Sequence, residues 1–321
     1  MKRRAGAMKD RLVTLFGGGG FVGRYAVRAL LATGARVRIA QRDPRHAWFL
    51  KTQGGLGQTQ VVAADITRPD TLAQALAGAN TVVNLVGVLS GDFQRYHVAG
   101  AQALAKAAAA AGVASFVQVS AIGADSHSAS AYGRSKGDGE AAVRAVFPDA
   151  TIVRPSIVFG REDQFVNRFA DMIAKAPVVP VLRAGVKFQP VFAGDVGDAI
   201  AALVADPLAH AGRTYELGGP DVIAMGALIR WIAEAIGRSP QILELPDFAG
   251  DLISRAGFLP LAPITRDQWL MLQHDNVVAE GTPGLAALGV QPTPLAAAAP
   301  AWLVRFRRQG RFGARAEQIG A

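Results

Sequence analysis

The stretch Leu12–Gly23, LVTLFGGGGFVG, decides the fold of this chain. A short apolar run ends at four glycines and resumes as Phe-Val-Gly, which predicts a buried parallel strand, a tight turn and the start of a helix. Gly17, Gly20 and Gly23 have the spacing G-x-x-G-x-x-G, which suits a tight turn, a close backbone approach to a pyrophosphate and close helix–strand packing. The pattern predicts a dinucleotide site at a helix N-terminus; the alternative is a glycine-rich turn that binds no ligand.

Composition limits the class of protein. The chain has 321 residues, of which 50% are hydrophobic and 18% charged, so we expect a globular protein of one large or two moderate domains. It has no cysteine, which excludes disulfides and thiol catalysis, and we find no cluster of metal ligands. No apolar run approaches the ~20 residues of a membrane-spanning helix, and the N-terminus lacks the apolar region of a signal peptide, with Met8 as an alternative start. The default compartment is the cytoplasm.

The excess of basic residues predicts an acidic partner. The formal net charge is +9, and many of the cations lie near the two ends of the chain. The N-terminal set is Lys2, Arg3, Arg4, Lys9 and Arg11, and the C-terminal set is Arg305, Arg307, Arg308, Arg311 and Arg315. Because Trp302, Phe306 and Phe312 are interleaved with the second set, this tail could bind anionic lipid headgroups or an acidic protein surface. The alternative is a solvated tail; no nucleic acid is expected, since no binding motif accompanies the charge.

Strand and helix patterns are found along the chain, and they alternate regularly in its first half. The expected strands are Leu12–Phe16, Arg36–Ala40, Gln60–Ala64, Thr81–Val86, Ser115–Ser120 and Gln241–Leu245. The expected helices are Phe21–Thr33, Pro69–Ala77, Gly100–Ala111, Asp163–Lys175, Asp195–Ala205 and Met225–Gly237. This alternation predicts right-handed βαβ units, and therefore an α/β fold with a doubly wound parallel Rossmann sheet and a smaller C-terminal α+β cap.

The same pattern suggests how the chain is divided. We expect a nucleotide-binding domain at residues 1–160 and a basic aromatic tail at 301–321. Between them, the cap at 161–300 is interleaved with helices and strands that return to the first domain. Leu252–Ile264 is apolar without a period, so it is either cap core or a surface that meets a partner.

The residues after the second strand favour NADP(H) over NAD(H), although NAD(H) remains an alternative. NAD-binding proteins usually carry an acid there for the ribose hydroxyls, whereas this chain has Gln41 and Arg42, and a guanidinium can pair with a 2′-phosphate. Arg24 is a second candidate for that phosphate, and the alternative for Arg42 is an ordinary surface arginine. Asp65, at the end of the third strand, is placed to accept from an adenine amino group or to cap its own loop.

Three residues in the region of the fifth strand and the helix after it predict a site for acid–base chemistry. Ser120 ends the fifth strand, and Tyr132 and Lys136 follow at a spacing of four, which places the phenol and the ammonium on one helix face. We expect the cation to favour the phenolate, so that tyrosine acts as acid or base near neutral pH while Ser120 hydrogen-bonds a substrate carbonyl. His97 is expected to pack or to form hydrogen bonds rather than to catalyse.

With these motifs in this order, the first part of the chain resembles the short-chain dehydrogenase/reductase superfamily of the extended or atypical kind. The second part is similar to the NADPH-binding accessory subunit of respiratory complex I (NADH:ubiquinone oxidoreductase) and its bacterial relatives. The motifs that carry this similarity are Arg161-Glu162-Asp163 with Phe165 and Asn167, Phe188-Gln189-Pro190-Val191, Tyr215-Glu216-Leu217-Gly218-Gly219-Pro220, Thr265-Arg266-Asp267-Gln268 and Asp275-Asn276-Val277-Val278. The resemblance covers roughly Leu12 to Val290.

The resemblance implies a protein that holds NADP(H) tightly and docks on the peripheral arm of complex I near the quinone site and the membrane. Its location would be peripheral, on the cytoplasmic side of the inner membrane, with a cofactor regarded as structural or regulatory. Carried over, Gly17, Gly20, Gly23 and Arg42 would hold phosphates, Asp65 the adenine, Tyr132 and Lys136 the nicotinamide ribose, and Pro155 and Ser156 would lie by the nicotinamide. The remaining residues expected at the cofactor are Phe21, Val22, Arg24, Gln41, Ile66, Leu85, Val86 and Gly87.

Two hypotheses on function follow. The first is an NADP(H)-binding accessory subunit of bacterial complex I, whose partners are peripheral-arm subunits and which turns over slowly or not at all. The second is a free-standing NADP-dependent reductase or epimerase that acts on a carbonyl or sugar-nucleotide substrate through Tyr132 and Lys136. Because the Ser-Tyr-Lys set is complete, the sequence leaves open whether the protein is an enzyme.

Overall fold

The computed structural model describes residues 8–257, 264–308 and 310 of the chain. Several residues singled out in the sequence lie outside these ranges, namely Lys2, Arg3, Arg4, Arg311, Phe312 and Arg315 and most of the second half of the apolar stretch Leu252–Ile264. The chain forms two compact units. The first comprises the described residues through Pro155, together with Ala193–Leu217 and Val278–Pro292, and the second comprises Ser156–Phe192, Gly218–Val277 and the described residues from Thr293 onward.

The first unit is built on a seven-stranded parallel sheet with the order β11-β6-β5-β4-β1-β2-β3. Its strands are β1 (Leu12–Phe16), β2 (Arg36–Gln41), β3 (Thr59–Ala63), β4 (Thr81–Asn84), β5 (Ser115–Val119), β6 (Thr151–Pro155) and β11 (Thr214–Leu217). Phe16, the last residue of β1, pairs with Ala40 of β2 and with Asn84 of β4. The strand order reverses between β1 and β4, and in open α/β sheets ligands bind at the carboxyl ends of strands at such a switch point.

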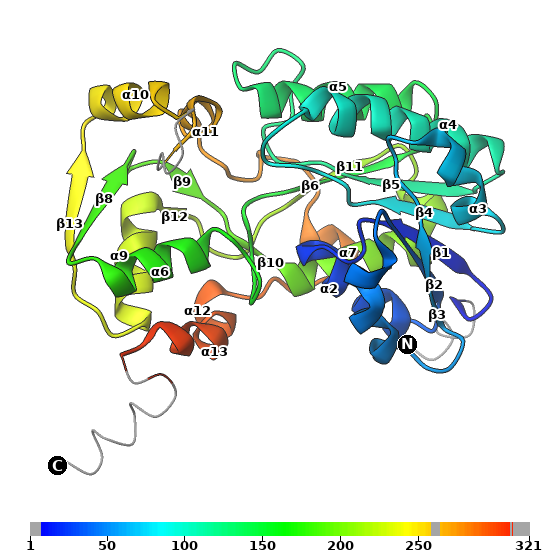
Figure 1. The fold of residues 1–321 in the computed structure, drawn as a ribbon, viewed down its shortest axis with the longest axis horizontal. Helices are drawn as coiled ribbons and strands as arrows, with labels where there is room; N and C mark the ends of the chain where they lie inside the picture. The colour runs from blue at the N-terminus through cyan, green and yellow to red at the C-terminus, as the bar shows by residue number, and fades with distance from the viewer. Residues whose placement is uncertain (1–7, 258–263, 309, 311–321) are drawn as a thin grey trace, which may run out of the picture. The chain divides into compact units, whose positions relative to one another are not determined.

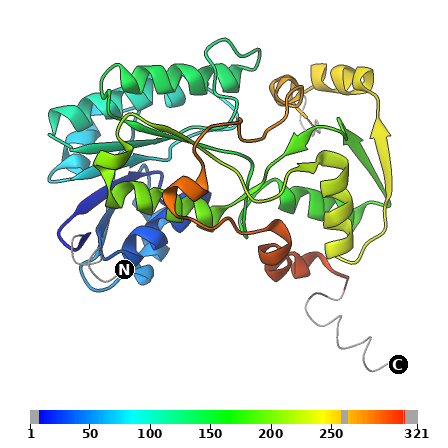
Figure 2. The same ribbon diagram turned by 180° about the vertical axis from the view of Figure 1, so that it is seen from behind.

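Helices cover both faces of this sheet, as Figures 1 and 2 show from opposite sides. One face carries α2 (Phe21–Ala32) and α7 (Ala193–Ala205), which pack on each other, and the other carries α3 (Leu72–Leu76), α4 (Ala101–Ala110) and α5 (Ala131–Arg144). Shorter segments of this unit are η1 (Pro44–Gln53), η2 (Pro69–Thr71), the π-helix η3 (Gln94–Gly100), α8 (Pro207–His210) and η4 (Leu285–Leu288). Because both faces are covered, β1, β4 and β5 are buried almost throughout. The predicted doubly wound parallel sheet is confirmed.

The second unit combines short strands and helices. Three strand pairs form in it: β7 (Val158–Phe159) with β10 (Val191–Phe192), β8 (Val178–Leu182) with β13 (Gln241–Leu245), and β9 (Lys187–Phe188) with β12 (Ile223–Ala224). Its helices are α6 (Val166–Lys175), α9 (Met225–Ala235), α10 (Asp247–Arg255), α11 (Arg266–Met271), α12 (Leu295–Ala298), α13 (Pro300–Leu303) and η5 (Val304–Phe306). Its core includes Ile229 and Ile232 of α9 and Phe159 of β7.

Trp302 corrects the interpretation of the C-terminal segment. The sequence placed it in a basic aromatic tail that could bind lipid headgroups or an acidic protein surface, but it is 8% exposed and stacks on Phe192 with ring centroids 6.4 Å apart. Arg307 is also engaged, since its Nε and Nη2 donate to the carbonyl of Ala235 at 3.2 and 3.1 Å. The start of the proposed tail is therefore part of the second unit.

Several predicted elements differ from the structure in their bounds, and for two of them the structure shows a local reason. The helix expected from Asp163 begins at Val166, because the Asp163 carboxylate accepts the backbone N–H groups of Gly160, Phe165 and Asn167 and so closes a turn before the helix. The strand expected to reach Val86 ends at Asn84, whose side-chain oxygen accepts the Val86 N–H at 3.1 Å.

In the part of the chain that the structure describes, no helix has both the length and the apolar character needed to cross a membrane. Among the same residues, no group of three or more His, Asp or Glu side chains could hold a metal ion.

Candidate functional site

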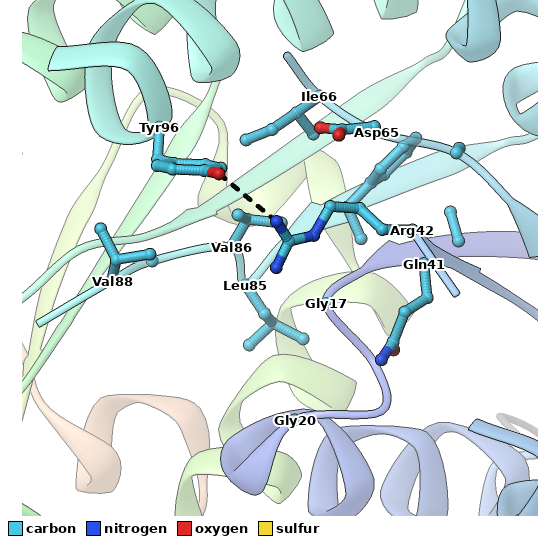
Figure 3. A pocket seen from close by; sticks show the side chains of 14 residues that line it. Gly17, Gly20, Gln41, Arg42, Asp65, Ile66, Leu85, Val86, Val88 and Tyr96 are labelled. Carbon is cyan, nitrogen blue, oxygen red and sulfur yellow. Dashed lines mark hydrogen bonds between the residues drawn. The ribbon is translucent and has the colours of Figure 1, made fainter. Parts of the chain in front are cut away.

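A cleft of about 210 Å³ opens in the first unit where the strand order reverses (Figure 3). The residues expected at a cofactor that line it are Gly17, Gly20, Gln41, Arg42, Asp65, Ile66, Leu85, Val86 and Gly87. They come from the ends of four neighbouring strands and from the loops that follow, so the fold brings together residues up to seventy positions apart. Phe16, Ala40, Ala64, Val88 and Tyr96 complete the lining.

The glycine loop after β1 has the shape that a pyrophosphate requires. Gly17 has φ +81°, which favours glycine, and a Cβ on Gly23 would lie 2.4 Å from the Gly17 carbonyl oxygen. α2 starts directly after this loop. Among the described residues, no side chain caps the helix at its N-cap residue, Gly20, and its first turn contains no acidic residue. The backbone N–H groups of that turn are therefore placed for an anion, and the loop fits the pyrophosphate of a dinucleotide.

Gln41 and Arg42 both line the cleft, but their side chains point in different directions (Figure 3). The Gln41 side-chain oxygen accepts the Gly19 N–H at 2.9 Å and so joins the end of β2 to the glycine loop. Arg42 is exposed, and in Figure 3 its guanidinium points across the cleft to Tyr96, whose hydroxyl accepts from Nη1 at 3.3 Å. Arg24 does not line the cleft; its guanidinium lies 5.0 Å from the ring centroid of Phe49.

The Asp65 carboxylate is engaged by its own loop. Its Oδ1 accepts the backbone N–H and the hydroxyl of Thr67, both at 2.9 Å, so the residue has the loop-capping contacts that were one of its two predicted roles. Its side chain nevertheless lines the cleft, beside the buried Ile66. Contact with an adenine stays a prediction.

Tyr132 and Lys136 lie on one face of α5, as their spacing indicates. The Lys136 ammonium lies 5.7 Å from the Tyr132 ring centroid and against Gly87, where a Cβ would be 3.1 Å from Nζ. Lys136 is therefore next to a residue that lines the cleft.

The predicted direction of the tyrosine pKa is wrong for this structure. Burial raises the pKa of Tyr132 to about 12, because the phenolate would lose its hydration, so the phenol is neutral and able to donate a proton. Burial also lowers the pKa of Lys136 to about 8, although Glu140, one turn on, opposes that shift. Desolvation is the cause of the raised pKa of Tyr132, although the Lys136 ammonium lies 5.7 Å from its ring centroid.

Ser120 follows β5 at the carboxyl edge of the sheet and is 5% exposed. Its hydroxyl is buried and, among the residues that the structure describes, has no hydrogen-bond partner. A buried hydroxyl left without a partner costs about 1–3 kcal/mol, so this group is expected to bind a ligand atom.

Comparison with known proteins decides the family. Residues 17–169 match the sequence profile described as NAD(P)H-binding. The chain is 38% identical over 293 residues to the mitochondrial "NADH dehydrogenase [ubiquinone] 1 alpha subcomplex subunit 9" of Rattus norvegicus, with 88% of this chain and 77% of that protein covered. The chain belongs to the alpha subcomplex subunit 9 family. It therefore carries an NAD(P)H-binding domain.

The chain is also similar to two reductases, one in sequence and one in structure. The chain is 32% identical over 241 residues to the "Ceramide reductase" of Caulobacter vibrioides, with 74% of each chain covered. An NADPH-dependent quinone oxidoreductase from Escherichia coli, crystallised with NADPH, has the same fold with a TM-score of 0.73 at 21% identity, covering 88% of this chain and 97% of that one. The chain thus has the same fold as this reductase.

Two of the motifs that pointed to the alpha subcomplex subunit 9 family, those of Asn167 and Asn276, hold loops together in the second unit. Ser156 is buried, and its hydroxyl donates to the Asn276 side-chain oxygen at 2.7 Å; the same oxygen accepts the Ile157 N–H at 3.0 Å. The Asn167 side-chain amide donates to the carbonyl of Asp163 at 2.8 Å. These residues have a structural role here, and the placement of Ser156 by a nicotinamide stays a prediction, as does that of Pro155 at the end of β6.

His97 packs and forms hydrogen bonds, as the sequence predicted, and these bonds link separate parts of the site. It is 3% exposed on the π-helix η3; its Nε2 accepts the Val88 N–H at 3.0 Å and its Nδ1 lies 2.8 Å from the Ser135 hydroxyl. The Ser135 hydroxyl in turn donates to the carbonyl of Tyr132 at 2.8 Å. Burial, with the neighbouring Lys136, lowers the pKa of His97 to about 3, so it is neutral and donates through Nδ1.

His97 therefore joins a cleft-lining loop to the helix that bears the tyrosine and the lysine. The contact is close, since a Cβ on Gly139 would lie 2.2 Å from the His97 carbonyl oxygen. Phe93 stacks on the imidazole with ring centroids 5.4 Å apart and meets the Tyr132 ring edge-on at 5.8 Å. The sequence offered one signal for this link, namely that a histidine, which can form hydrogen bonds, follows the fourth strand.

Proposed function

We propose that this chain is an NADP(H)-holding accessory subunit of a bacterial respiratory complex I. The observation that carries the proposal is the 38% identity to the rat subunit over 88% of the chain, which extends through both units and not only the nucleotide-binding one. The partners would be peripheral-arm subunits, and the location would be peripheral, on the cytoplasmic side of the membrane near the quinone site. Sequence similarity to subunits of that complex supports the partners, while the side of the membrane and the place near the quinone site are part of the proposal.

The cleft supports NADP(H) as the nucleotide held. Arg42 points into the cleft at the place where NAD-binding proteins carry an acid, and Gln41 beside it is uncharged. The loop from Gly17 to Gly23 would hold the pyrophosphate, and Arg42 the 2′-phosphate. When bound, the nicotinamide would supply or accept hydride, and the neutral phenol of Tyr132 would lie ready only to donate a proton. A structural cofactor is consistent with this arrangement.

The test is a pull-down of a tagged full-length chain from gently solubilised native membranes, with identification of both proteins and nucleotide. We expect complex I subunits and close to one NADP(H) per chain. Arg42→Asp should co-purify with less NADP(H), whereas Arg45→Asp, a nearby exposed arginine that pairs with Asp43 instead of lining the cleft, should not. A lone protein with loosely held nucleotide would contradict the proposal.

A second function, an NADP-dependent carbonyl reductase, is favoured by the Ser120 hydroxyl. That group is buried without a partner among the described residues, which suits a substrate oxygen, and Tyr132 can donate a proton. The similarity to a bacterial ceramide reductase suggests an apolar carbonyl substrate. NADPH oxidation that depends on such a substrate and is lost in Tyr132→Phe would establish this function, and silence across a broad carbonyl panel would exclude it for those substrates.

A further inference from the structure

The helix η1 of the first unit presents aromatic side chains to solvent. Trp48 is 55% exposed and Phe49 44% exposed, and Leu56 in the turn that follows is fully exposed. Ala47 and Leu50, between and beside them, are completely buried and anchor the helix. The exposed aromatics are therefore held in place by their neighbours, and a cluster of exposed apolar side chains is a feature of interaction surfaces.

Cations surround these side chains. The Arg24 guanidinium lies 5.0 Å from the Phe49 ring centroid, and the Lys51 ammonium lies 5.8 Å from that of Trp48. From position 44 to position 64 the sequence contains no Asp or Glu, and the nearest acid, Asp43, is already bound by Arg45. We call Trp48, Phe49, Leu56, Arg24 and Lys51 the aromatic–basic patch; its net charge is positive.

A second exposed apolar pair has different surroundings. On α10, in the second unit, Phe248 is 76% exposed and Leu252 is 68% exposed. Two acids lie beside them, and the arginines there are bound to these acids: Arg183 to Asp247, and Arg255 and Arg266 to Asp251. Exposure of apolar side chains is thus common to both places, and the two acids distinguish the α10 surface from the aromatic–basic patch.

We propose that the aromatic–basic patch docks on an anionic lipid bilayer. Tryptophan prefers the interface between water and hydrocarbon, because its ring is apolar and its N–H can be hydrated. Lysine and arginine with long apolar stems reach the phosphate groups of the lipids from the same position. This inference goes beyond the proposed function: it concerns the chain alone and needs neither complex I nor a nucleotide.

The test uses the purified full-length chain and vesicle flotation. We expect binding to vesicles that contain phosphatidylglycerol, little binding to pure phosphatidylcholine, and weaker binding at high salt because exposed charges are screened. Trp48→Ser with Phe49→Ser should reduce binding at least about tenfold, since the apolar area of two aromatic rings is lost. Lys51→Glu should reduce it for reasons of charge.

Matched variants separate this patch from other surfaces. Phe248→Ser with Leu252→Ser removes a similar apolar area from α10 and should leave vesicle binding unchanged. Each variant is first shown to bind NADPH like the parent, so that lost vesicle binding is not lost folding. The proposal is overturned if the chain ignores phosphatidylglycerol vesicles, if the Trp48 and Phe49 variant still floats, or if only substitution of Arg311 and Arg315 abolishes binding.

Discussion

Replacing His97 with phenylalanine separates its hydrogen bonds from its shape. The ring and its stacking on Phe93 are kept, but the Val88 N–H loses its acceptor and Ser135 loses a donor. Ser135 keeps its bond to the carbonyl of Tyr132, so the main loss is one partly buried backbone N–H left without its partner. At pH 7 we expect His97→Phe to lower the free energy of unfolding by about 1–3 kcal/mol.

The pH dependence of this loss has a defined sign. The pKa of His97 is about 3 in the folded protein, below its ordinary value of 6.5, so below pH 6.5 the unfolded chain binds a proton that the folded protein does not. The native protein therefore loses stability through this residue as the pH falls from 6.5 toward 3. Between pH 7 and 5 the loss is at most about 2 kcal/mol, and about 1 kcal/mol once water in the adjoining cleft is allowed for. His97→Phe lacks it.

The assay is urea unfolding of both proteins at pH 7 and pH 5, followed by circular dichroism. The difference in unfolding free energy between native protein and variant should shrink by about 1 kcal/mol at the lower pH. His274→Gln, which changes an exposed histidine, serves as the control and should keep its difference constant. The reasoning is refuted if the unfolding free energies of the native protein and of His97→Phe change by the same amount from pH 7 to pH 5.

Three further predictions test the cleft and its support. Arg42→Asp should weaken NADPH binding by about 1–3 kcal/mol in a fluorescence titration while NADH binding changes little, and equal losses for both nucleotides would place the 2′-phosphate elsewhere. Gly23→Ala should abolish nucleotide binding and lower the melting temperature, because the new methyl would lie 2.4 Å from a backbone carbonyl oxygen; a bound, stable variant would show that the loop can move. Arg154→Met leaves Glu140, 6% exposed, without its bidentate partner and should lower the unfolding free energy by about 3 kcal/mol, whereas Arg68→Met, from an exposed ion pair, should change it by less than about 1 kcal/mol.

Local sequence patterns were enough to predict a helix or strand where one residue type, such as glycine, fixes the backbone conformation. The first helix was expected at Phe21–Thr33 and runs to Ala32, because Gly34 with φ +91° follows and its N–H bonds back to the helix. The expected strand Gln60–Ala64 is shifted by one residue, to Thr59–Ala63. Such elements can be predicted because apolar period and turn chemistry lie within a few neighbouring positions.

The rest depended on contacts between distant residues. The helix η1 went unpredicted, since only two of its side chains, Ala47 and Leu50, are buried and its exposed side chains mix aromatic and charged residues without an apolar period. His97 contacts Val88 and Ser135, 9 and 38 positions away, and no local pattern shows that. The tyrosine pKa was assigned the wrong direction because the sequence gives the distance to a cation along a helix but not the extent of burial.

The discontinuous path of the chain has a consequence for its biosynthesis. β6 is complete at Pro155, yet its outer neighbour β11 lies at Thr214–Leu217 and the last segment of the first unit ends at Pro292. As the chain emerges from the ribosome, the edge of β6 therefore stays unpaired while the first segment of the second unit, Ser156–Phe192, and helices α7 and α8 are made, a state prone to wrong pairing. A further contact of this unit also forms late, because the Glu216 carboxylate on β11 accepts the backbone N–H of Ala279 at 2.9 Å. The nucleotide-binding unit is thus among the last parts of the protein to close, although it begins first.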